Sequence, residues 1–271
     1  MIEINIEPEL ASFGPLLITW HGLFAAIGIA LGVLLVVLEL RRKELTRVDV
    51  AEAALWVLPA AVVGARLAHV IDHSSYYLAN PLAILAITEG GLSIFGGIVG
   101  GLIGGASYMR IRALPFWAIV DAAVPAMLIG QSVGRIGCLI NGDAWGAPTN
   151  LPWAVVYTHP AASLPPDLLG VGTHPYPVYE ITWNLALLAA LWPLRRSRLP
   201  DGTMFCLYAV GYSLGRLVLS VVRQETAVWW NLQQAQVIAI IVMVIALTAV
   251  ISRMSRTSSL DHQVSSQPPD D

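Results

Sequence analysis

Arginines that lie within long apolar stretches are the residues of this sequence best suited to chemistry. Arg66, Arg135 and Arg216 each stand inside such a stretch, and Arg223 stands at the end of one. A charged side chain at the centre of a bilayer costs at least about 2.5–3.5 kcal/mol, so such residues usually face an interior cavity and mark function. A guanidinium group binds phosphate through two parallel hydrogen bonds. The pattern therefore predicts a buried site for a phosphate-bearing anion.

Two of these arginines end the same six-residue pattern. Residues 130–135 read Gly-Gln-Ser-Val-Gly-Arg, and residues 211–216 read Gly-Tyr-Ser-Leu-Gly-Arg. Glycines four residues apart let helix backbones approach closely, so each arginine would stand beside a tight crossing. The alternative is a pair of packing motifs with arginines that snorkel to the interface. The Gly-x-Ser-x-Gly string also resembles a nucleophile elbow, but that motif needs a strand-turn-helix context, so polar contacts between helices are the favoured role of Ser132 and Ser213.

Four further polar residues are candidates for the same site. Asn141 and Asp143 follow Arg135 closely, between glycines that allow a sharp turn, and could bind a phosphate and a polyol; a capped helix end is the alternative. Glu180 could balance an arginine or orient a substrate hydroxyl, or it could simply complement a helix dipole. His21 is a candidate base or headgroup ligand, although a lone histidine is usually structural.

The sequence indicates no metal site, since no histidine and carboxylate set has metal-ligand spacing. Cys138 and Cys206 lie in apolar stretches and are expected to be small core residues.

The elements that must position these residues are membrane-spanning helices. The chain has 271 residues, of which 56% are hydrophobic and 12% are charged, whereas a soluble domain normally carries about 25% charge. A span needs about 20 apolar residues. Seven segments meet this requirement: about 16–40, 50–71, 91–109, 115–139, 177–194, 203–222 and 233–252.

Basic residues predict the orientation of these spans. Four segments hold 11 of the 15 lysines and arginines, at 41–47, 110–112, 195–198 and 253–256, whereas the segments 1–15, 72–90 and 140–176 hold none. Lys and Arg collect on the cytoplasmic side, so the N-terminus is expected outside and the C-terminus in the cytoplasm. The second, fourth and sixth spans then share one direction, and their arginines can converge at one depth.

The predicted fold is thus all-α, a single polytopic membrane bundle over residues 1–256. An outer, proline-rich loop is expected at about 140–176, and such long loops are often functional. Residues 257–271 are expected to form a short disordered cytoplasmic tail.

A family resemblance rests on a long motif. Residues 130–153, from Gly130 through Asn141-Gly142-Asp143 to Trp153, resemble the signature G-Q-x-x-G-R-x-G-N-x-x-N-G-E-x-W-G-x-P-T of the prolipoprotein diacylglyceryl transferase family. Shorter matches follow in family order over about residues 15–250: Gly64-Ala65-Arg66-Leu67, Glu89-Gly90-Gly91-Leu92-Ser93 with Gly96-Gly97, His174-Pro175 with Tyr179-Glu180, and Tyr212 with Arg216 and Arg223.

The resemblance implies a seven-span enzyme of the bacterial inner membrane. Such enzymes move the diacylglyceryl group of phosphatidylglycerol onto the lipobox cysteine of a preprolipoprotein signal peptide, forming a thioether and releasing glycerol-1-phosphate. The expected partners are these two substrates and membrane lipids, with no nucleic acid, and no cofactor is implied. The family's essential arginines correspond to Arg135, which would hold the headgroup, and Arg216, which would stabilise the leaving oxygen. His21 is the candidate base. The predicted substrate-binding residues are Arg135, Asn141, Asp143, Tyr212, Glu180, Arg66 and Arg223.

The sequence departs from the family pattern in four places. Phe95 replaces a histidine, His21 replaces a tyrosine, Ser220 replaces an acid, and Asp143 replaces a glutamate. These changes leave two other classes open. One is a transporter or flippase of lipids or anionic metabolites, in which arginines would also bind anions; the other is an inactive, lipid-binding paralogue.

Overall fold

The structure is a computed structural model that describes residues 1–14, 16–86, 91, 93–197, 199–223, 227–229 and 232–265. Among the residues used above, Glu89, Gly90, Leu92 and Arg198 lie outside this part of the chain. The described residues form two compact units, Met1–Val36 with Val120–Asp271 and Val37–Ile119, which are considered separately.

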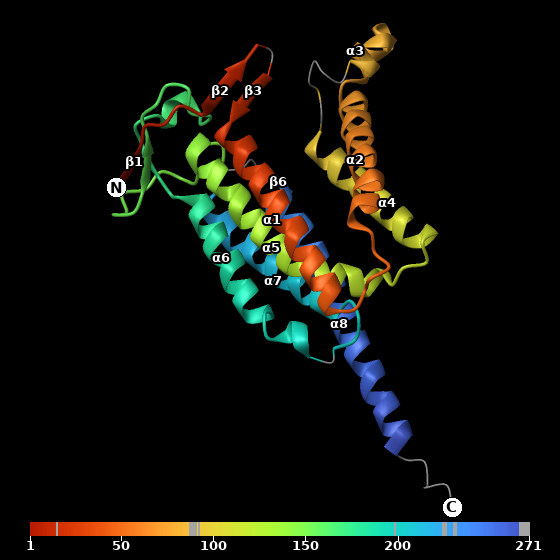
Figure 1. Cartoon of the computed structure of the whole chain (residues 1–271). Coiled ribbons are helices and arrows are strands. Elements are labelled where there is room, and N and C mark those ends of the chain that lie inside the picture. The colour runs from red at the N-terminus through yellow and green to blue at the C-terminus, as the bar shows by residue number, and fades with distance from the viewer. Residues whose placement is uncertain are drawn as a thin grey trace, which may run out of the picture. The chain divides into compact units, whose positions relative to one another are not determined.

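Helices make up most of the fold (Figure 1). They are α1 (Trp20–Arg42), α2 (Val50–Asp72), α3 (Ser74–Ala79), α4 (Ile94–Ile111), α5 (Phe116–Asn141), α6 (Tyr176–Leu191), α7 (Thr203–Leu219) and α8 (Gln234–Ser265). The short 3-10 helices are η1 (Pro81–Leu85), η3 (Pro166–Leu168), η4 (Leu194–Arg196) and η5 (Ser220–Val222).

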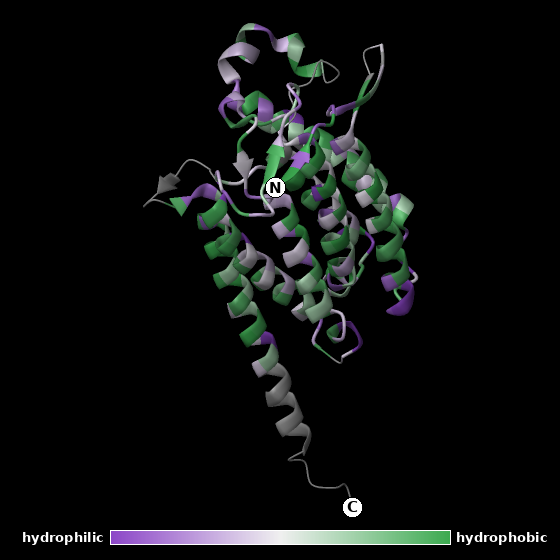
Figure 2. Cartoon of the chain, turned by 90° about the vertical axis from the view of Figure 1, so that its left-hand side faces the viewer, coloured by the Kyte–Doolittle hydropathy of each residue, from purple (hydrophilic) through white to green (hydrophobic). Residues whose placement is uncertain are grey.

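Five helices of the described chain are long and apolar enough to cross a membrane: Trp20–Arg42, Val50–Asp72, Phe116–Asn141, Thr203–Val222 and Gln234–Ser255. Large apolar side chains stand exposed on their outer faces, such as Leu55 at 74% and Ile245 at 65%, and Figure 2 shows the apolar colour along the helices. Exposed apolar surface on this scale suits lipid, not water. The chain is therefore a polytopic membrane protein. The expected helices at 91–109 and 177–194 are present as α4 and α6, with 18 and 16 residues.

Short strands add to the all-α fold that the sequence predicts. The parallel pair β1 (Ile2–Ile4) and β4 (Val155–Tyr157) joins the antiparallel β5 (Gly172–Thr173) in one sheet. Two hairpins pair β2 (Glu9–Phe13) with β3 (Leu16–Thr19) and β6 (Ala227–Trp229) with β7 (Leu232–Gln233). The segment 140–176 thus carries strands, and one of them pairs with the N-terminal strand.

The first span begins later than predicted. Residues 16–19 form β3, and the helix starts at Trp20, because the Thr19 hydroxyl accepts the Gly22 N–H at 3.0 Å and caps the first turn. At the other end of the chain, α8 continues to Ser265, into the segment expected to be a tail. Residues 266–271 lie outside the described residues, and disorder of the segment stays a prediction.

In the unit Val37–Ile119, glycines bring α2 and α4 together. A Cβ atom on Gly100 would lie 2.1 Å from the Ala60 carbonyl oxygen, and one on Gly96 would lie 2.3 Å from the Gly64 carbonyl oxygen. Gly96 and Gly100, four residues apart on α4, therefore form a surface on which the two helix backbones pack.

Candidate functional site

In the larger unit, helix α1 crosses α5 at glycines of the long motif, residues 130–153. A Cβ on Gly28 of α1 would lie 2.8 Å from the Gly130 carbonyl oxygen of α5, and one on Gly137 would lie 2.7 Å from the Cα of His21. The two helices approach this closely because glycines occupy the crossing. As a result, the first turn of α1 lies directly against the part of α5 that carries Arg135 and Cys138.

The second six-residue motif, residues 211–216 on α7, packs against helix α6. The carbonyl oxygen of Gly211 accepts the indole N–H of Trp183 at 3.0 Å, and the indole fills the space where a Cβ on Gly215 would stand. Gly211 and Gly215 on α7 thus make room for side chains of α6, whereas the sequence predicts a close approach of two helix backbones. Gly134 differs, because nothing lies within 4 Å of its Cβ position and it lines a cavity instead of a crossing.

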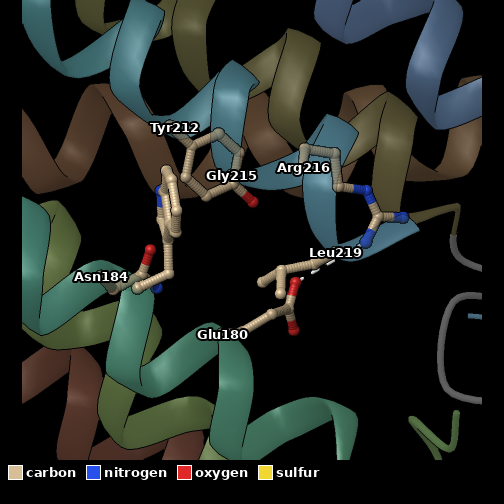
Figure 3. Close-up of a pocket in the computed structure, with 7 residues that line it drawn as sticks. Glu180, Asn184, Tyr212, Gly215, Arg216 and Leu219 are labelled. Atoms are coloured by element: carbon tan, nitrogen blue, oxygen red, sulfur yellow. Dashed lines mark ion pairs between the residues drawn. The ribbon is translucent and has the colours of Figure 1, made fainter. Parts of the chain in front are cut away.

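Glu180 on α6 joins the two motif arginines. Its carboxylate oxygens lie 2.5 Å from Nε and 3.1 Å from Nη2 of Arg135, and 3.6 Å from Nη1 of Arg216. Figure 3 shows Glu180 and Arg216 facing each other from neighbouring helices. The Glu180 residue is only 7% exposed, so one buried carboxylate stands between two guanidinium groups. The cluster keeps an excess positive charge.

Tyr176, which the sequence did not single out, completes this cluster. Its hydroxyl donates to Glu180 at 3.1 Å and accepts a short hydrogen bond from Arg216. The guanidinium carbon of Arg223 lies 5.0 Å from the centre of its ring, within the range of a cation–π contact. Tyr176 is fully buried, so it holds three charged residues around one fixed ring. Its place at the start of α6, four residues before Glu180, is the signal that could have found it.

Arg135 faces a cavity of about 230 Å³. The lining residues are His21, Gln131, Gly134, Arg135, Cys138, Glu180, Asn184 and Tyr212. A smaller hollow beside it contains Arg216 and shares Glu180, Asn184 and Tyr212 with the first (Figure 3). Both arginines therefore line adjoining hollows within the bundle, and their side chains are only 27% and 17% exposed.

His21, Asp143 and Cys138 meet at the edge of this cavity. His21 Nδ1 lies 2.8 Å from Asp143 Oδ2 and 3.6 Å from Cys138 Sγ. Asp143 reaches the histidine because Gly142, with φ +75°, ends α5 and turns the chain, as the sequence predicts. Two departures from the family pattern, His21 and Asp143, thus contact each other.

Cys138 is a buried core residue, as expected, and it also lines the cavity. One terminal nitrogen of Arg135 also lies 3.7 Å from its sulfur. The available signal was its position, since the family signature has asparagine there. No spacing rule could have joined Cys138 to His21, because 117 residues separate them.

The remaining candidates have other surroundings. Asn141 is 6% exposed, and its side-chain oxygen has no hydrogen-bond partner among the described residues. Arg66 lies in the other unit, where it donates to the carbonyls of Ala83, Ile84, Ala86 and Gly91, from 2.5 to 3.2 Å. That arginine holds the backbone of the segment around η1 against α2.

The serines of the two motifs are not placed as nucleophiles. The Ser132 hydroxyl donates to the Leu128 carbonyl of its own helix at 2.7 Å, and Ser213 is 3% exposed. Ser220, which replaces a family acid, donates to the Arg216 carbonyl at 2.5 Å. The hydrogen bond of Ser132 lies within its own helix, whereas the sequence favours polar contacts between helices for this residue.

Fold and site together define a polytopic membrane protein with a positively charged cavity inside its helix bundle. The sequence model of the family described as "Prolipoprotein diacylglyceryl transferase" matches residues 8–252. The chain belongs to this family, whose members are transferases.

Relatives named phosphatidylglycerol–prolipoprotein diacylglyceryl transferase match nearly the whole chain. One from Dehalococcoides mccartyi is 36% identical over 262 residues, covering 96% of this chain and 99% of its own. One from Synechococcus elongatus is 35% identical over 253 residues, covering 90% and 86%. One from Trichormus variabilis is 33% identical over 266 residues, covering 96% and 94%.

Proposed function

We propose that this chain moves the diacylglyceryl group of phosphatidylglycerol onto the lipobox cysteine of a preprolipoprotein. The products are a thioether-linked lipoprotein precursor and glycerol-1-phosphate. Support comes from the family match and from relatives that carry this activity in their names. The observation that carries the proposal is the pair of guanidinium groups, Arg135 and Arg216, around the buried Glu180 beside a cavity.

The enzyme works as a seven-span protein of the bacterial inner membrane, with its N-terminus outside and its C-terminus in the cytoplasm. Helices α4 and α6 supply the two spans beyond the five that length and composition identify. At 1.5 Å per residue, the 16 residues of α6 reach about 24 Å, close to the roughly 30 Å hydrocarbon core. The basic segments all fall on the cytoplasmic side of this arrangement.

Charge explains how the cavity would hold the headgroup. Two arginines and one glutamate leave a net positive charge in low dielectric, which a phosphate diester neutralises. Arg135 grips the phosphate, and Arg216 stabilises the charge that grows on the leaving oxygen. Asn141, Asp143 and Tyr212 contact the headgroup glycerol, and Arg223 supports the charged network, whereas Arg66 acts within its own unit. The unpartnered side-chain oxygen of Asn141 suits a glycerol hydroxyl as its donor.

The nucleophile belongs to the substrate protein. The cysteine thiol loses its proton, its sulfur forms a bond to the glyceryl carbon, and the bond from that carbon to the phosphate oxygen breaks. Glycerol-1-phosphate leaves with the electron pair. His21 takes the thiol proton at Nε2 while Asp143, 2.8 Å from Nδ1, holds the ring in the tautomer that leaves Nε2 free to accept it.

A substitution at Arg135 tests the proposal. Purified variants are incubated with labelled phosphatidylglycerol and a lipobox peptide, and the thioether product is quantified. Arg135→Lys keeps the charge but loses the two-nitrogen fork, and we expect the rate to fall by about 10²–10³-fold. Arg112→Lys is the matched control, because Arg112 pairs with Glu52 in the other unit. Full transfer by Arg135→Ala would exclude the proposed role.

The same assay separates the other classes. A transporter or flippase would move labelled lipid between leaflets without forming a covalent product. An inactive paralogue would bind lipid, give no product, and fail to support growth of a strain depleted of its own transferase.

A further inference from the structure

His21, Cys138 and Asp143 form a group of potential metal ligands. The donor atoms, Nδ1, Sγ and a carboxylate oxygen, all lie within 4.8 Å of one another. The second carboxylate oxygen of Asp143 is buried and has no hydrogen-bond partner among the described residues. Imidazole, thiolate and carboxylate are the three ligand types that zinc takes in proteins.

The distances between the donor atoms are close to those around a tetrahedrally coordinated zinc ion. With Zn–N near 2.05 Å and Zn–S near 2.3 Å, a tetrahedral angle sets the N–S edge at about 3.6 Å. The observed distance from His21 Nδ1 to Cys138 Sγ is 3.6 Å. The edge from nitrogen to carboxylate oxygen would be about 3.4 Å, so Asp143 must move outward by about 0.6 Å from its hydrogen-bonded distance of 2.8 Å. A side chain at a helix end can make this shift.

Charge and access also suit a divalent cation. A thiolate at Cys138 and the carboxylate of Asp143 neutralise the two charges of the ion, while Glu180 neutralises the neighbouring Arg135. The side chains of His21 and Asp143 are 46% and 31% exposed, so the ligands are accessible from outside the helix bundle. A thiolate with an imidazole selects zinc over magnesium or calcium, which prefer oxygen ligands.

The arrangement differs from a catalytic triad. In a triad, the acid and the nucleophile use opposite nitrogens of the histidine. Here Asp143 and Cys138 both approach Nδ1, so no proton can pass from one to the other through the ring. The three donor atoms instead lie within 4.8 Å of one another, as the ligands of a single ion do.

We propose that His21, Cys138 and Asp143 bind one zinc ion, whose open fourth position takes the cysteine thiolate of the substrate protein. This inference rests on the proposed function. Cys138 and His21 line the cavity that also contains Arg135, so a sulfur bound to the ion would stand beside a phosphate held by that arginine. Three protein ligands with one open position are typical of catalytic zinc.

The reaction then balances without a separate base. The substrate thiol releases its proton to solvent on coordination, because a coordinating thiol is deprotonated outright. The bound sulfur donates an electron pair to the glyceryl carbon, the bond from carbon to phosphate oxygen breaks, and glycerol-1-phosphate departs with that bond's electrons. The ion keeps its charge, and His21 serves as a ligand in place of its role as the base.

Cobalt(II) is the probe for the site, since it takes the same ligands and reports them in its absorption. The full chain, purified in detergent and freed of metal, is titrated with cobalt. We expect one ion per chain, with the near-ultraviolet absorption of a cobalt–thiolate bond. Cys138→Ser should remove that absorption and weaken binding by at least about 100-fold. Cys206→Ser is the matched control, because Cys206 is the other cysteine and packs between α7 and α8.

The following results test the zinc site and the proposed function separately. An absorption that persists in Cys138→Ser, or equal cobalt binding by the wild type and Cys138→Ser, overturns the zinc site. In the transfer assay, we expect chelation to lower the rate at least tenfold and zinc to restore it. Full transfer by the chelated enzyme overturns the inference but leaves the proposed function intact. A chain that gives the cobalt–thiolate absorption when loaded with cobalt, but forms no product when loaded with zinc, supports the site and overturns the proposed function.

Discussion

Neutralising Glu180 is the perturbation whose effect the structure specifies best. Glu180→Gln keeps the size of the side chain but removes the single negative charge between Arg135 and Arg216. Removing one partner of a buried ion pair costs about 3–5 kcal/mol of stability, because the remaining charge is left without its counter-charge. The glutamine amide retains some hydrogen bonds, and the arginine side chains, 27% and 17% exposed, still reach water. We therefore expect a loss of about 2 kcal/mol in the free energy of unfolding, or roughly 30-fold in the ratio of folded to unfolded chains.

The assay is denaturant unfolding in detergent micelles, followed by circular dichroism. Glu52→Gln provides the comparison, since Glu52 pairs with the exposed Arg112 and exposed pairs contribute little. A double variant, Glu180→Gln with Arg216→Gln, should lose less than the sum of the two single losses, because the second change removes an uncompensated charge. Equal stability of Glu180→Gln and Glu52→Gln, or strict additivity in the double variant, would refute the electrostatic reasoning.

Three other predictions address packing, capping and pH. Asp121→Asn should cost about 1–2 kcal/mol of unfolding free energy, because the buried carboxylate accepts two backbone N–H bonds, of 2.7 and 2.8 Å, at the start of α7; unchanged denaturant midpoints would contradict it. Gly215→Ala should cost about 1–3 kcal/mol, because the new methyl group meets the Trp183 indole, whereas Gly134→Ala has open space and should keep the midpoint. Burial raises the pKa of Tyr157 above that of the unfolded chain, so the folded chain holds this proton longer. Stability should fall as pH rises past about 10, where the unfolded tyrosine begins to ionise. Tyr157→Phe should flatten this decline in unfolding titrations from pH 8 to 11, and an unchanged slope would assign the decline to other groups.

Local patterns were sufficient to predict the helices. Apolar runs of about 20 residues placed the spans to within a few residues, because a helix in lipid must satisfy its own backbone hydrogen bonds and offer apolar side chains outward. The exceptions were the start of α1, where a hairpin and the Thr19 cap override an apolar stretch, and the end of α8, which continues to Ser265 beyond the predicted residue 252. Periodicity cannot detect a strand pairing of this kind.

The charged cluster was predicted in part. Arg135, Arg216 and Glu180 stood out because charge is rare in apolar segments, and the structure brings these three together. Tyr176 did not stand out, because a tyrosine in a helix has many ordinary uses. Arg66 looked equivalent to the other arginines in the sequence, but its guanidinium is held by backbone carbonyls of its own unit.

The amino-acid sequence alone determines that the chain is a membrane helix protein with buried arginines, since hydropathy and charge are properties of each residue. It also carries the long motif that identifies the family. Which side chains touch is a property of the packed helices, because residues 117 positions apart meet only where glycines let α1 and α5 cross. For that reason the contact of His21 with Asp143 and Cys138, and the single carboxylate shared by two arginines, emerged from the folded structure alone.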